Sequence, residues 1–440
     1  MFWDHRMDWR KIRRDLSWAA GYQLASKLVG YVVLLILIRY LSQERMGEFF
    51  FAVTLATFVA MIGELGTNQH LVRMISARPE KALDLLSRVV TVRLPFMALA
   101  FLLINGFALI FKREIASTIL LASIYVLLRE WYFSFGAFFV GLRRVGYRVL
   151  TALLSQLLLL GGVLLLVGMK AGLSTILWWY IGAHAVTIVV SLGLIRSRFG
   201  PIEVRWNPGE LREILRGAFP LFLLTFLGLM HFKVDTVMLG LLQPFSAVAV
   251  YESAYKFLEA SRSLVWPGVM IFFPVCASLA ASGSWPALSA LSRRLLLIAT
   301  AMAATAMLLM LLTADWVVPA LFGARYVDSV PVLRVLFLAA PALFAALVAT
   351  YLASAMSVER PVVTILLASL ALNIGLNAVF IPAWGPMGAA WATLGSEVLL
   401  AVGSLAVVWS ALRARQTRPV PVVATPDWRL SAWSGEGSDG

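Results

Sequence analysis

The sequence predicts an all-α integral membrane protein with about twelve transmembrane helices. Three observations lead to this fold class. First, 61% of the 440 residues are hydrophobic and only 14% are charged, whereas a soluble domain is about half apolar and a quarter charged. Second, apolar runs of about 20 residues, enough to cross ~30 Å of hydrocarbon as helix, recur along the whole chain. Third, most Lys and Arg residues lie between these runs.

The apolar runs divide into two sets of six expected helices. The first set covers residues 16–39, 48–67, 90–111, 115–141, 148–168 and 174–195. The second set covers residues 218–242, 247–281, 295–321, 331–357, 361–382 and 387–411.

The connector between the two sets, residues 196–217, has the Pro, Gly and charged residues of a surface linker. Within it, residues 208–216 form an amphipathic stretch suited to the membrane interface. We therefore expect a six-helix lobe at 16–195, a linker at 196–217 and a second six-helix lobe at 218–412. Segments 1–15 and 413–440 flank the lobes, and the latter is rich in Pro, Thr, Ser and Gly, which predicts disorder.

The charges of the connectors predict the orientation in the membrane. With residues 1–15 in the cytoplasm, the connectors on that side carry about four times as many Lys and Arg residues as those on the opposite side. This positive-inside pattern places both termini in the cytoplasm. Because the basic residues flank membrane spans, the formal net charge of +14 does not indicate a nucleic-acid partner.

The sequence gives no indication of an enzyme. The single cysteine, Cys276, and the histidines His70, His184 and His231 lack metal-ligand spacing. The chain has no Gly-rich phosphate loop of the Walker type and no nucleophile-and-base grouping. We therefore expect no catalytic residue, no cofactor and no metal site.

Ionisable side chains inside the expected helices are the functional candidates, because a charge at mid-bilayer costs about 2.5 to 3.5 kcal/mol. Lys27, Arg129 and Glu397 lie near the middle of the first, fourth and twelfth helices. Lys233 and Asp235 lie in the seventh, two residues apart and so roughly 200° apart around the helix. Each of the two therefore needs a partner on another helix.

The eighth expected helix carries a charged stripe, since Glu252, Lys256, Glu259 and Arg262 fall on one face. Two interpretations remain open. The stripe lines a cavity and pairs with the seventh helix, or the helix is longer than the bilayer and the stripe protrudes into water. Arg93, one turn inside the third expected helix, is predicted to extend to the headgroups.

Five segments, in order, resemble the polysaccharide-biosynthesis flippases, which are Wzx-like members of the multidrug/oligosaccharidyl-lipid/polysaccharide (MOP) exporter superfamily. Glu64, in the first segment, stands where an Asp is usual in that family. The segments are GELGTNQHLVRMIS (63–76), LREILRGAFPLFLLTFLGLMHFKVDTVMLG (211–240), AVAVYESAYKF (247–257), LFGARYVDSVPVLRVL (321–336) and NIGLNAVFIPAWGPMGAAWATLGSEV (373–398).

The resemblance implies a MATE-like, V-shaped pair of six-helix lobes around a central cavity. It also implies a flippase in the cytoplasmic (inner) membrane, which moves a polyprenyl-diphosphate-linked oligosaccharide between leaflets by alternating access. Such a protein serves the synthesis of O-antigen, capsule or exopolysaccharide. Its expected partners are this lipid-linked glycan, membrane lipids, and a polysaccharide polymerase and glycosyltransferases.

With this substrate, the charged candidates take two roles. Lys27, Arg129, Lys233 and Lys256 would hold the diphosphate and acidic sugars. The acids Asp235, Glu252 and Glu397 would exchange protons or Na⁺ during the return step. Neither assignment follows from residue spacing alone.

Two other functions remain open. A proton- or sodium-coupled exporter of small molecules from the same superfamily would be favoured by a predominantly acidic pocket. A membrane glycosyltransferase or polymerase would present a large outward loop or an acidic motif in a connector. The longest connectors here, residues 68–89 and 196–217, are basic and on the predicted cytoplasmic side.

Overall fold

Residues 26–416 are described by a computed structural model. In this range the secondary structure is helical, without a β-strand. A helix over residues 26–40 comes first. The helices that follow are α2 (Gln43–Glu64), α3 (Thr67–Ala77), α4 (Ala82–Phe111), α5 (Ala116–Gly141), α6 (Val145–Gly168), α7 (Leu173–Arg198), α8 (Pro208–Leu242), α9 (Phe245–Ala281), α10 (Trp285–Phe322), α11 (Ser329–Leu338), α12 (Ala340–Ala355), α13 (Glu359–Trp384) and α14 (Pro386–Gln416).

The helices confirm the predicted fold class. Among the described residues, nine helices are long and apolar enough to cross a membrane, and the pair α11 and α12, bent by 42°, makes a tenth candidate span. The helix over residues 26–40 and helix α9 occupy the other two predicted positions. The predicted count of twelve is therefore compatible with the structure. Segment 1–15 and residues 417–440 of the predicted tail lie outside the described range, and residues 413–416 are the end of α14.

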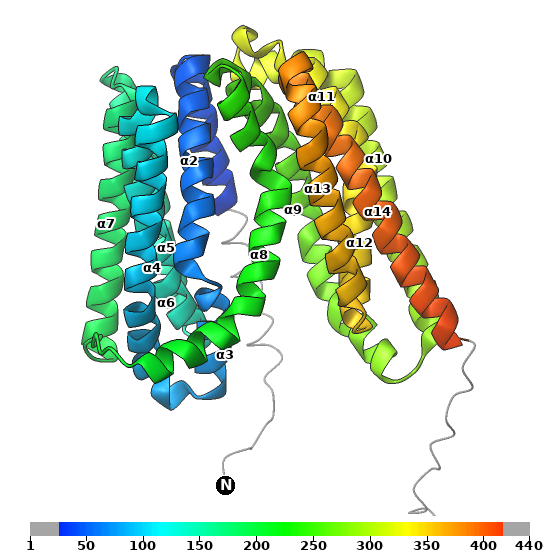
Figure 1. Ribbon diagram of the computed structural model, residues 1–440, viewed down its shortest axis with the longest axis horizontal. Coiled ribbons are helices and arrows are strands. Elements are labelled where there is room, and N and C mark those ends of the chain that lie inside the picture. The colour runs from blue at the N-terminus through cyan, green and yellow to red at the C-terminus, as the bar shows by residue number, and fades with distance from the viewer. Residues whose placement is uncertain (1–25, 417–440) are drawn as a thin grey trace, which may run out of the picture.

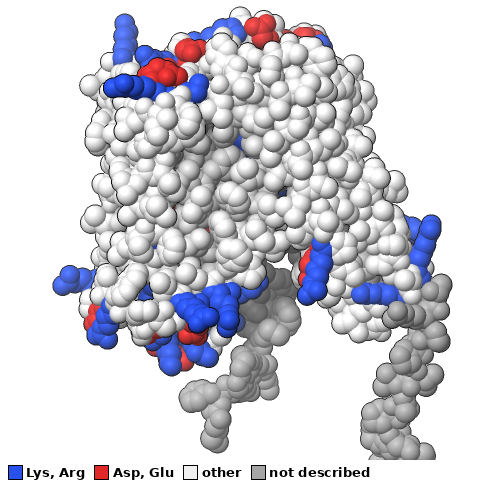
Figure 2. Space-filling model, in the orientation of Figure 1, with Lys and Arg blue, Asp and Glu red and all other residues white. Residues whose placement is uncertain are grey.

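The helices form two bundles, which we call the first lobe (residues 26–40 and α2–α7) and the second lobe (α8–α14). Figure 1 shows that the lobes meet at the upper end and diverge toward the lower end. Charged side chains gather at these two ends, and the band between them is almost entirely uncharged on the surface shown in Figure 2. An apolar band of this kind faces hydrocarbon in a membrane protein.

At the upper end, two arginines join the lobes through backbone carbonyls. The Nε of Arg39 donates to the carbonyl of Leu321 over 2.8 Å, and its Nη2 donates to Ala320, so Arg39 caps the end of α10. In return, Arg325 donates to the carbonyls of Ile38 and Arg39, at the end of the first helix. These carbonyls belong to helix termini, which lack intrahelical donors. The two caps seal the upper end.

Helices α2 and α9 also approach closely at this end. A Cβ at Gly47 would lie 1.7 Å from the carbonyl oxygen of Phe245, so only glycine permits the contact. One turn earlier, the carboxylate of Glu44 accepts a hydrogen bond from the backbone N–H of Ser246 over 2.9 Å, at the start of α9. Acidic groups at a helix N-terminus are stabilising. The upper contact is therefore backbone to backbone, with little room for movement.

At the lower end, the predicted helix 48–67 is broken. Helix α2 ends at Glu64, and Leu65 and Gly66 have φ of 52° and 72°. The Glu64 carboxylate accepts hydrogen bonds from the backbone N–H groups of Gly66 and Asn68, which stabilises the turn into α3. A Cβ at Gly66 would lie 2.5 Å from the backbone nitrogen of Phe222, so this turn rests directly on α8.

Helix α8 connects the lobes. Asn207 caps its start by accepting from the N–H of Gly209 over 3.0 Å, and Pro208 occupies the first turn. The amphipathic stretch 208–216 is thus the first part of α8 rather than a separate element. Figure 1 shows it running along the lower end before the helix turns upward. Ile214 packs in the apolar core of the first lobe, whereas Leu227 and Val234 pack against Leu370 of α13.

Arg93 corrects one prediction. Its side chain does not extend to the headgroups, because it has no solvent exposure. The guanidinium donates to Asn68 over 2.9 Å and to the hydroxyl of Ser134, and it lies 5.1 Å from the centre of the Trp131 ring. A cation over an aromatic face is stabilised when water is excluded. Arg93 therefore joins α3, α4 and α5 inside the first lobe.

Candidate functional site

A cavity of about 470 Å³ lies between the lobes, and we call it the central cavity. The first lobe contributes Arg129 of α5 to its wall, and the second lobe contributes Lys233 of α8 and Lys256 of α9. Glu252 and Glu259 of α9 complete the charged part of the wall. The structure thus brings together three of the four side chains that the sequence predicts to bind substrate.

The two lysines and two glutamates of the second lobe form one cluster. The Nζ of Lys233 lies 3.0 Å from Glu252 and 3.8 Å from Glu259. The Nζ of Lys256 lies 2.8 Å from Glu259 and 3.5 Å from Glu252. Each lysine therefore touches both carboxylates. Of the two interpretations of the α9 stripe, the structure supports the cavity, because Glu252 is only 1% exposed.

The cluster compensates its own charges. The charges of the two lysines are balanced by Glu252 and Glu259. Aromatic rings shield them further, since Lys233 lies 4.9 Å from the centre of the Tyr255 ring. Low local polarity strengthens each of these interactions. An anion entering the cavity must therefore compete with the two carboxylates for the lysines.

Arg129 is less fully paired. Its Nη2 lies 3.2 Å from both the hydroxyl of Thr57 and the carboxylate of Glu130. Its Nε is buried and has no hydrogen-bond partner among residues 26–416. A buried donor without a partner costs about 1–3 kcal/mol. Arg129 is therefore the strongest candidate in the cavity wall for an incoming acceptor.

Lys27 lies at the edge of the cavity rather than on its wall. Its side chain is exposed, and its Nζ donates to the hydroxyl of Ser263 of α9 over 3.2 Å. Gly30, one turn further along the same helix, does line the cavity. Lys27 thus bridges the two lobes on the side away from the upper seal.

A second polar cluster lies inside the second lobe, and we call it the interior cluster. Asp235 is 1% exposed and accepts hydrogen bonds from the hydroxyl of Tyr251 over 2.8 Å and of Thr393 over 2.9 Å. It also accepts from the amide of Asn377, which in turn donates to Asn373 over 2.9 Å. Helices α8, α9, α13 and α14 therefore all meet at one carboxylate.

Glu397 lies next to the interior cluster. Its Oε1 lies 3.2 Å from the Nε2 of His231, and both side chains are nearly inaccessible. The three predicted ion-coupling acids are therefore divided. Glu252 is part of the central cavity, whereas Asp235 and Glu397 lie in the interior of the second lobe, away from the cavity wall.

The sequence contains a signal for the interior cluster that residue-by-residue inspection misses. His231 and Asp235, Asn373 and Asn377, and Thr393 and Glu397 are each spaced by four. Such pairs lie on one face of a helix. Three polar pairs at this spacing in three apolar helices indicate a shared buried site. Of the six residues, only Asp235 and Glu397 were predicted to be site residues.

Residues 12–280 match the family model described as polysaccharide biosynthesis protein. The chain belongs to the polysaccharide biosynthesis protein family. Among curated proteins, no match to the sequence is found.

Solved structures share the fold of this member of the polysaccharide biosynthesis protein family. An inward-facing multidrug resistance MATE family transporter of the MOP superfamily aligns with a TM-score of 0.70 at 15% identity, over 89% of this chain and 96% of that one. The lipid II flippase MurJ, in an inward closed conformation, aligns with a TM-score of 0.63 at 14% identity, over 90% and 91%. A MOP superfamily transporter from Pyrococcus furiosus aligns with a TM-score of 0.54 at 13% identity, over 92% and 94%. These likenesses confirm the MATE-like fold.

Proposed function

We propose that the protein is a flippase that moves a polyprenyl-diphosphate-linked oligosaccharide across the cytoplasmic membrane for cell-surface polysaccharide synthesis. The observation that carries this proposal is the central cavity, where Arg129 of one lobe faces Lys233 and Lys256 of the other. Guanidinium and ammonium groups are the side chains that bind phosphate oxygens most strongly. Membership in the polysaccharide biosynthesis family supports the glycan part of the substrate.

The proposed step is alternating access. The lower end faces the cytoplasm, because its connectors carry the excess of Lys and Arg. In the described conformation the lobes are sealed above by Arg39 and Arg325 and diverge below, so a substrate from the inner leaflet can enter. Outward movement of an anion is favoured by about 2.3 kcal/mol per charge per 100 mV when the cytoplasm is negative.

In this proposal, the diphosphate takes the place of the carboxylates. The unpartnered Nε of Arg129 gains an acceptor, and Lys233 and Lys256 exchange Glu252 and Glu259 for phosphate oxygens. The released glutamates then repel the ligand, which keeps binding reversible.

We assign ion coupling to Asp235. The Oδ1 of Asn377, beside it, is buried and has no hydrogen-bond partner among the described residues. Carboxylate and amide oxygens together suit a hard cation such as Na⁺. The arrangement also suits a proton, which would turn the carboxylate into a donor. Either occupant would change the packing of α8 against α13 and α14, and α8 also carries Lys233.

Transport is tested by the fate of lipid-linked glycan in cells that lack the gene. An external glycan-cleaving enzyme distinguishes the outer-leaflet pool from the protected inner-leaflet pool. We expect protected intermediate to accumulate, and the intact chain and Arg113→Ala to restore access. Arg113 is an exposed arginine at the upper end, outside the cavity, and provides the control. Arg129→Ala should fail to restore access although it is inserted normally.

A second function, a proton- or sodium-coupled exporter of small molecules, has one observation in its favour. Glu252 and Glu259 give the cavity acidic groups that a cationic compound could bind. In the same cells, unchanged glycan pools together with sensitivity to small toxic cations would support the exporter and contradict the flippase.

A further inference from the structure

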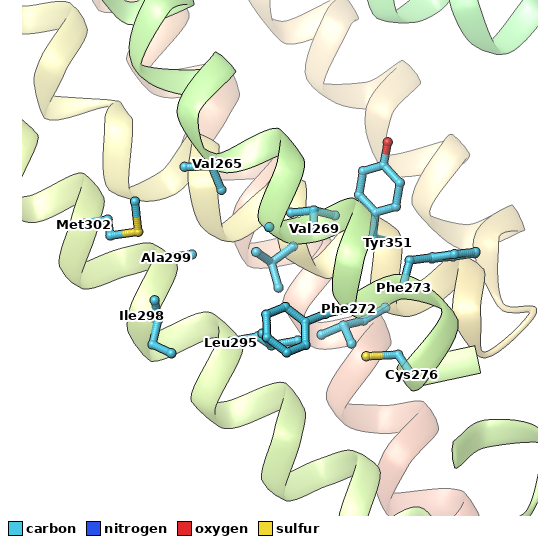
Figure 3. A pocket seen from close by; sticks show the side chains of 13 residues that line it. Val265, Val269, Phe272, Phe273, Cys276, Leu295, Ile298, Ala299, Met302 and Tyr351 are labelled. Carbon is cyan, nitrogen blue, oxygen red and sulfur yellow. The ribbon is translucent and has the colours of Figure 1, made fainter. Parts of the chain in front are cut away.

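A second cavity, of about 180 Å³, lies among α9, α10 and α12, and we call it the lateral groove. Figure 3 shows its lining: Val269 and Cys276 come from α9, Ile298 and Met302 from α10, and Tyr351 from α12. The lining is hydrocarbon or sulfur except for the Tyr351 hydroxyl. An apolar channel of this composition does not bind sugars or ions.

The mouth of the lateral groove faces the membrane. Ile298 is 56% exposed, Met302 46% and Phe272 39%, and all three belong to apolar stretches of α9 and α10. A Cβ at Gly268 would meet nothing within 4 Å, so this glycine leaves an opening in the wall. In a bilayer, such an opening is filled by a lipid chain, because water cannot satisfy its hydrogen bonds there.

A third cavity, of about 200 Å³, lies further along the same two helices, α9 and α12. Its wall contains Lys233 and Glu259 of the cluster together with Arg262. Arg262 lies 3.7 Å from the centre of the Phe232 ring, and Val265 of the groove follows one turn later. The α9 surface is thus charged from Glu252 to Arg262 and apolar from Val265 to Cys276.

We propose that the lateral groove binds the isoprenoid chain of the lipid-linked substrate while its diphosphate lies at the Lys233 and Lys256 cluster. This inference rests on the proposed function. A ligand with an anionic head and a long apolar chain matches a surface that changes from charged to apolar along one helix. The chain leaves the protein through the mouth of the groove, so its remainder stays in the bilayer during transport. The flippase then needs to enclose only the diphosphate and the glycan.

The alternative occupant is an acyl chain of an ordinary phospholipid. Proximity to the cluster favours the isoprenoid chain, because Arg262, in the cavity with Lys233, lies only one turn of α9 from Val265 of the groove. A phospholipid entering from the lower end would bury only its acyl chain and would leave Lys233 paired with Glu252 and Glu259. The two occupants therefore differ in whether a diphosphate is needed for binding.

Cys276 allows a direct test, because it is the only cysteine in the chain and its sulfur points into the groove in Figure 3. The probe is a polyprenyl diphosphate with a methanethiosulfonate on its chain, added to the purified full chain in phosphatidylcholine and phosphatidylglycerol vesicles. The Cys276 thiolate displaces methanesulfinate and forms a disulfide with the probe. We expect labelling in the intact mass spectrum, competition by unmodified polyprenyl diphosphate, and no labelling of Cys276→Ser.

Two matched glycine variants sharpen the test. Gly268→Leu fills the groove and should reduce labelling about tenfold, as displacing about two methylenes of the chain would. Gly161→Leu places the same side chain on α6, at another glycine with nothing within 4 Å, and should label as the unmodified chain does. Equal labelling of both variants would overturn the proposal. So would equal labelling by a phospholipid with the same reactive group that polyprenyl diphosphate does not displace.

The same variants separate this inference from the proposed function. If Gly268→Leu loses the probe and also leaves glycan protected in cells, the groove and the flippase both stand. If the intact chain binds the probe but never changes the glycan pools, isoprenoid binding stands and the flippase function is wrong. If Gly268→Leu transports normally and is labelled normally, the proposal that the groove binds the isoprenoid chain is wrong, and the proposed flippase function is unaffected.

Discussion

The two faces of α8 compensate a buried charge in different ways. Lys233 points into the central cavity, where it shares two carboxylates with Lys256 and touches water-accessible space. Asp235, two residues later, points into the second lobe, where four helices supply its hydrogen bonds. A spacing of two residues, roughly 200° around a helix, produces this division. One helix therefore connects a site open to ligands with a site enclosed by protein.

Position along a membrane helix therefore does not by itself define the role of a charged residue. Lys233 and Asp235 lie at nearly the same depth in the membrane, and the burial of each charge carries a desolvation cost. The cavity side compensates with opposite charges that a ligand can replace. The interior side compensates with hydrogen bonds that only a small ion can join. Substitutions on the cavity face should consequently impair substrate binding and transport, whereas substitutions on the interior face should impair ion coupling.

The largest effect is expected for Lys233→Met. It leaves Glu252 buried with one lysine instead of two, and breaking a buried pair costs about 3–5 kcal/mol. We expect loss of glycan transport and a clear decrease in thermal stability in detergent. The double variant Lys233→Met/Glu252→Gln removes both charges and should recover stability without transport. Recovery of transport in the double variant would show that Lys233 acts only as a counter-charge.

The next effect is expected for Asp235→Leu. It removes the carboxylate to which Tyr251, Asn377 and Thr393 donate. A buried donor that then lacks an acceptor costs about 1–3 kcal/mol. Asp235→Asn keeps the shape and part of the hydrogen bonding. We expect transport by Asp235→Asn to lose its dependence on Na⁺ or on the proton gradient while binding of polyprenyl diphosphate stays normal. Weakened binding of the diphosphate would contradict the separation of the two sides.

A smaller effect is expected for Glu397→Gln. The amide can still accept a hydrogen bond from His231, so the pair loses only its charge-assisted part, on the order of 1 kcal/mol. Unfolding in detergent should begin slightly earlier, and the ion dependence of transport should shift without disappearing. His231→Gln serves as the reciprocal variant. An additive double variant would show that the two residues do not act as a pair.

The smallest effect on stability is expected for Glu259→Gln. Its side chain is 44% exposed, and partly exposed ion pairs contribute about 0.2–1 kcal/mol. Binding of polyprenyl diphosphate should nevertheless become tighter, because Lys256 loses a competing carboxylate. Calorimetry with short-chain prenyl diphosphate measures this change. Weaker binding would indicate that Glu259 orients the lysines instead of competing with the ligand.

Most of the helical architecture could be predicted from the sequence. Runs of apolar residues must be helical in a membrane, because every backbone N–H and C=O needs a partner within its own segment. The predicted ends differ mainly where polar residues extend a helix beyond the hydrocarbon. Helix α10, for example, starts at Trp285 rather than at residue 295. The break at Leu65 and Gly66 was not predictable from hydropathy, because it depends on a carboxylate capping the turn.

The site was only partly predictable. Residues on α8 and α9 could be paired because the two helices are consecutive and joined by a short turn, so Lys233 and Glu252 had to be close. Partners such as Asn377 and Thr393 lie 142 and 158 residues from Asp235 in the sequence. Helix spacing shows which face such residues share, but not which helices pack together. The burial of Arg93 depends on the same tertiary information.

The seal at the upper end has a consequence for regulation. Its donors are the guanidinium groups of Arg39 and Arg325, and its acceptors are peptide carbonyls at the ends of two helices. A change of side chain at the acceptor positions therefore cannot remove the acceptors. The seal opens only when the two lobes move relative to each other around an occupied cavity and pull the two helix ends apart. Opening of the seal is therefore coupled to binding of the substrate in the central cavity.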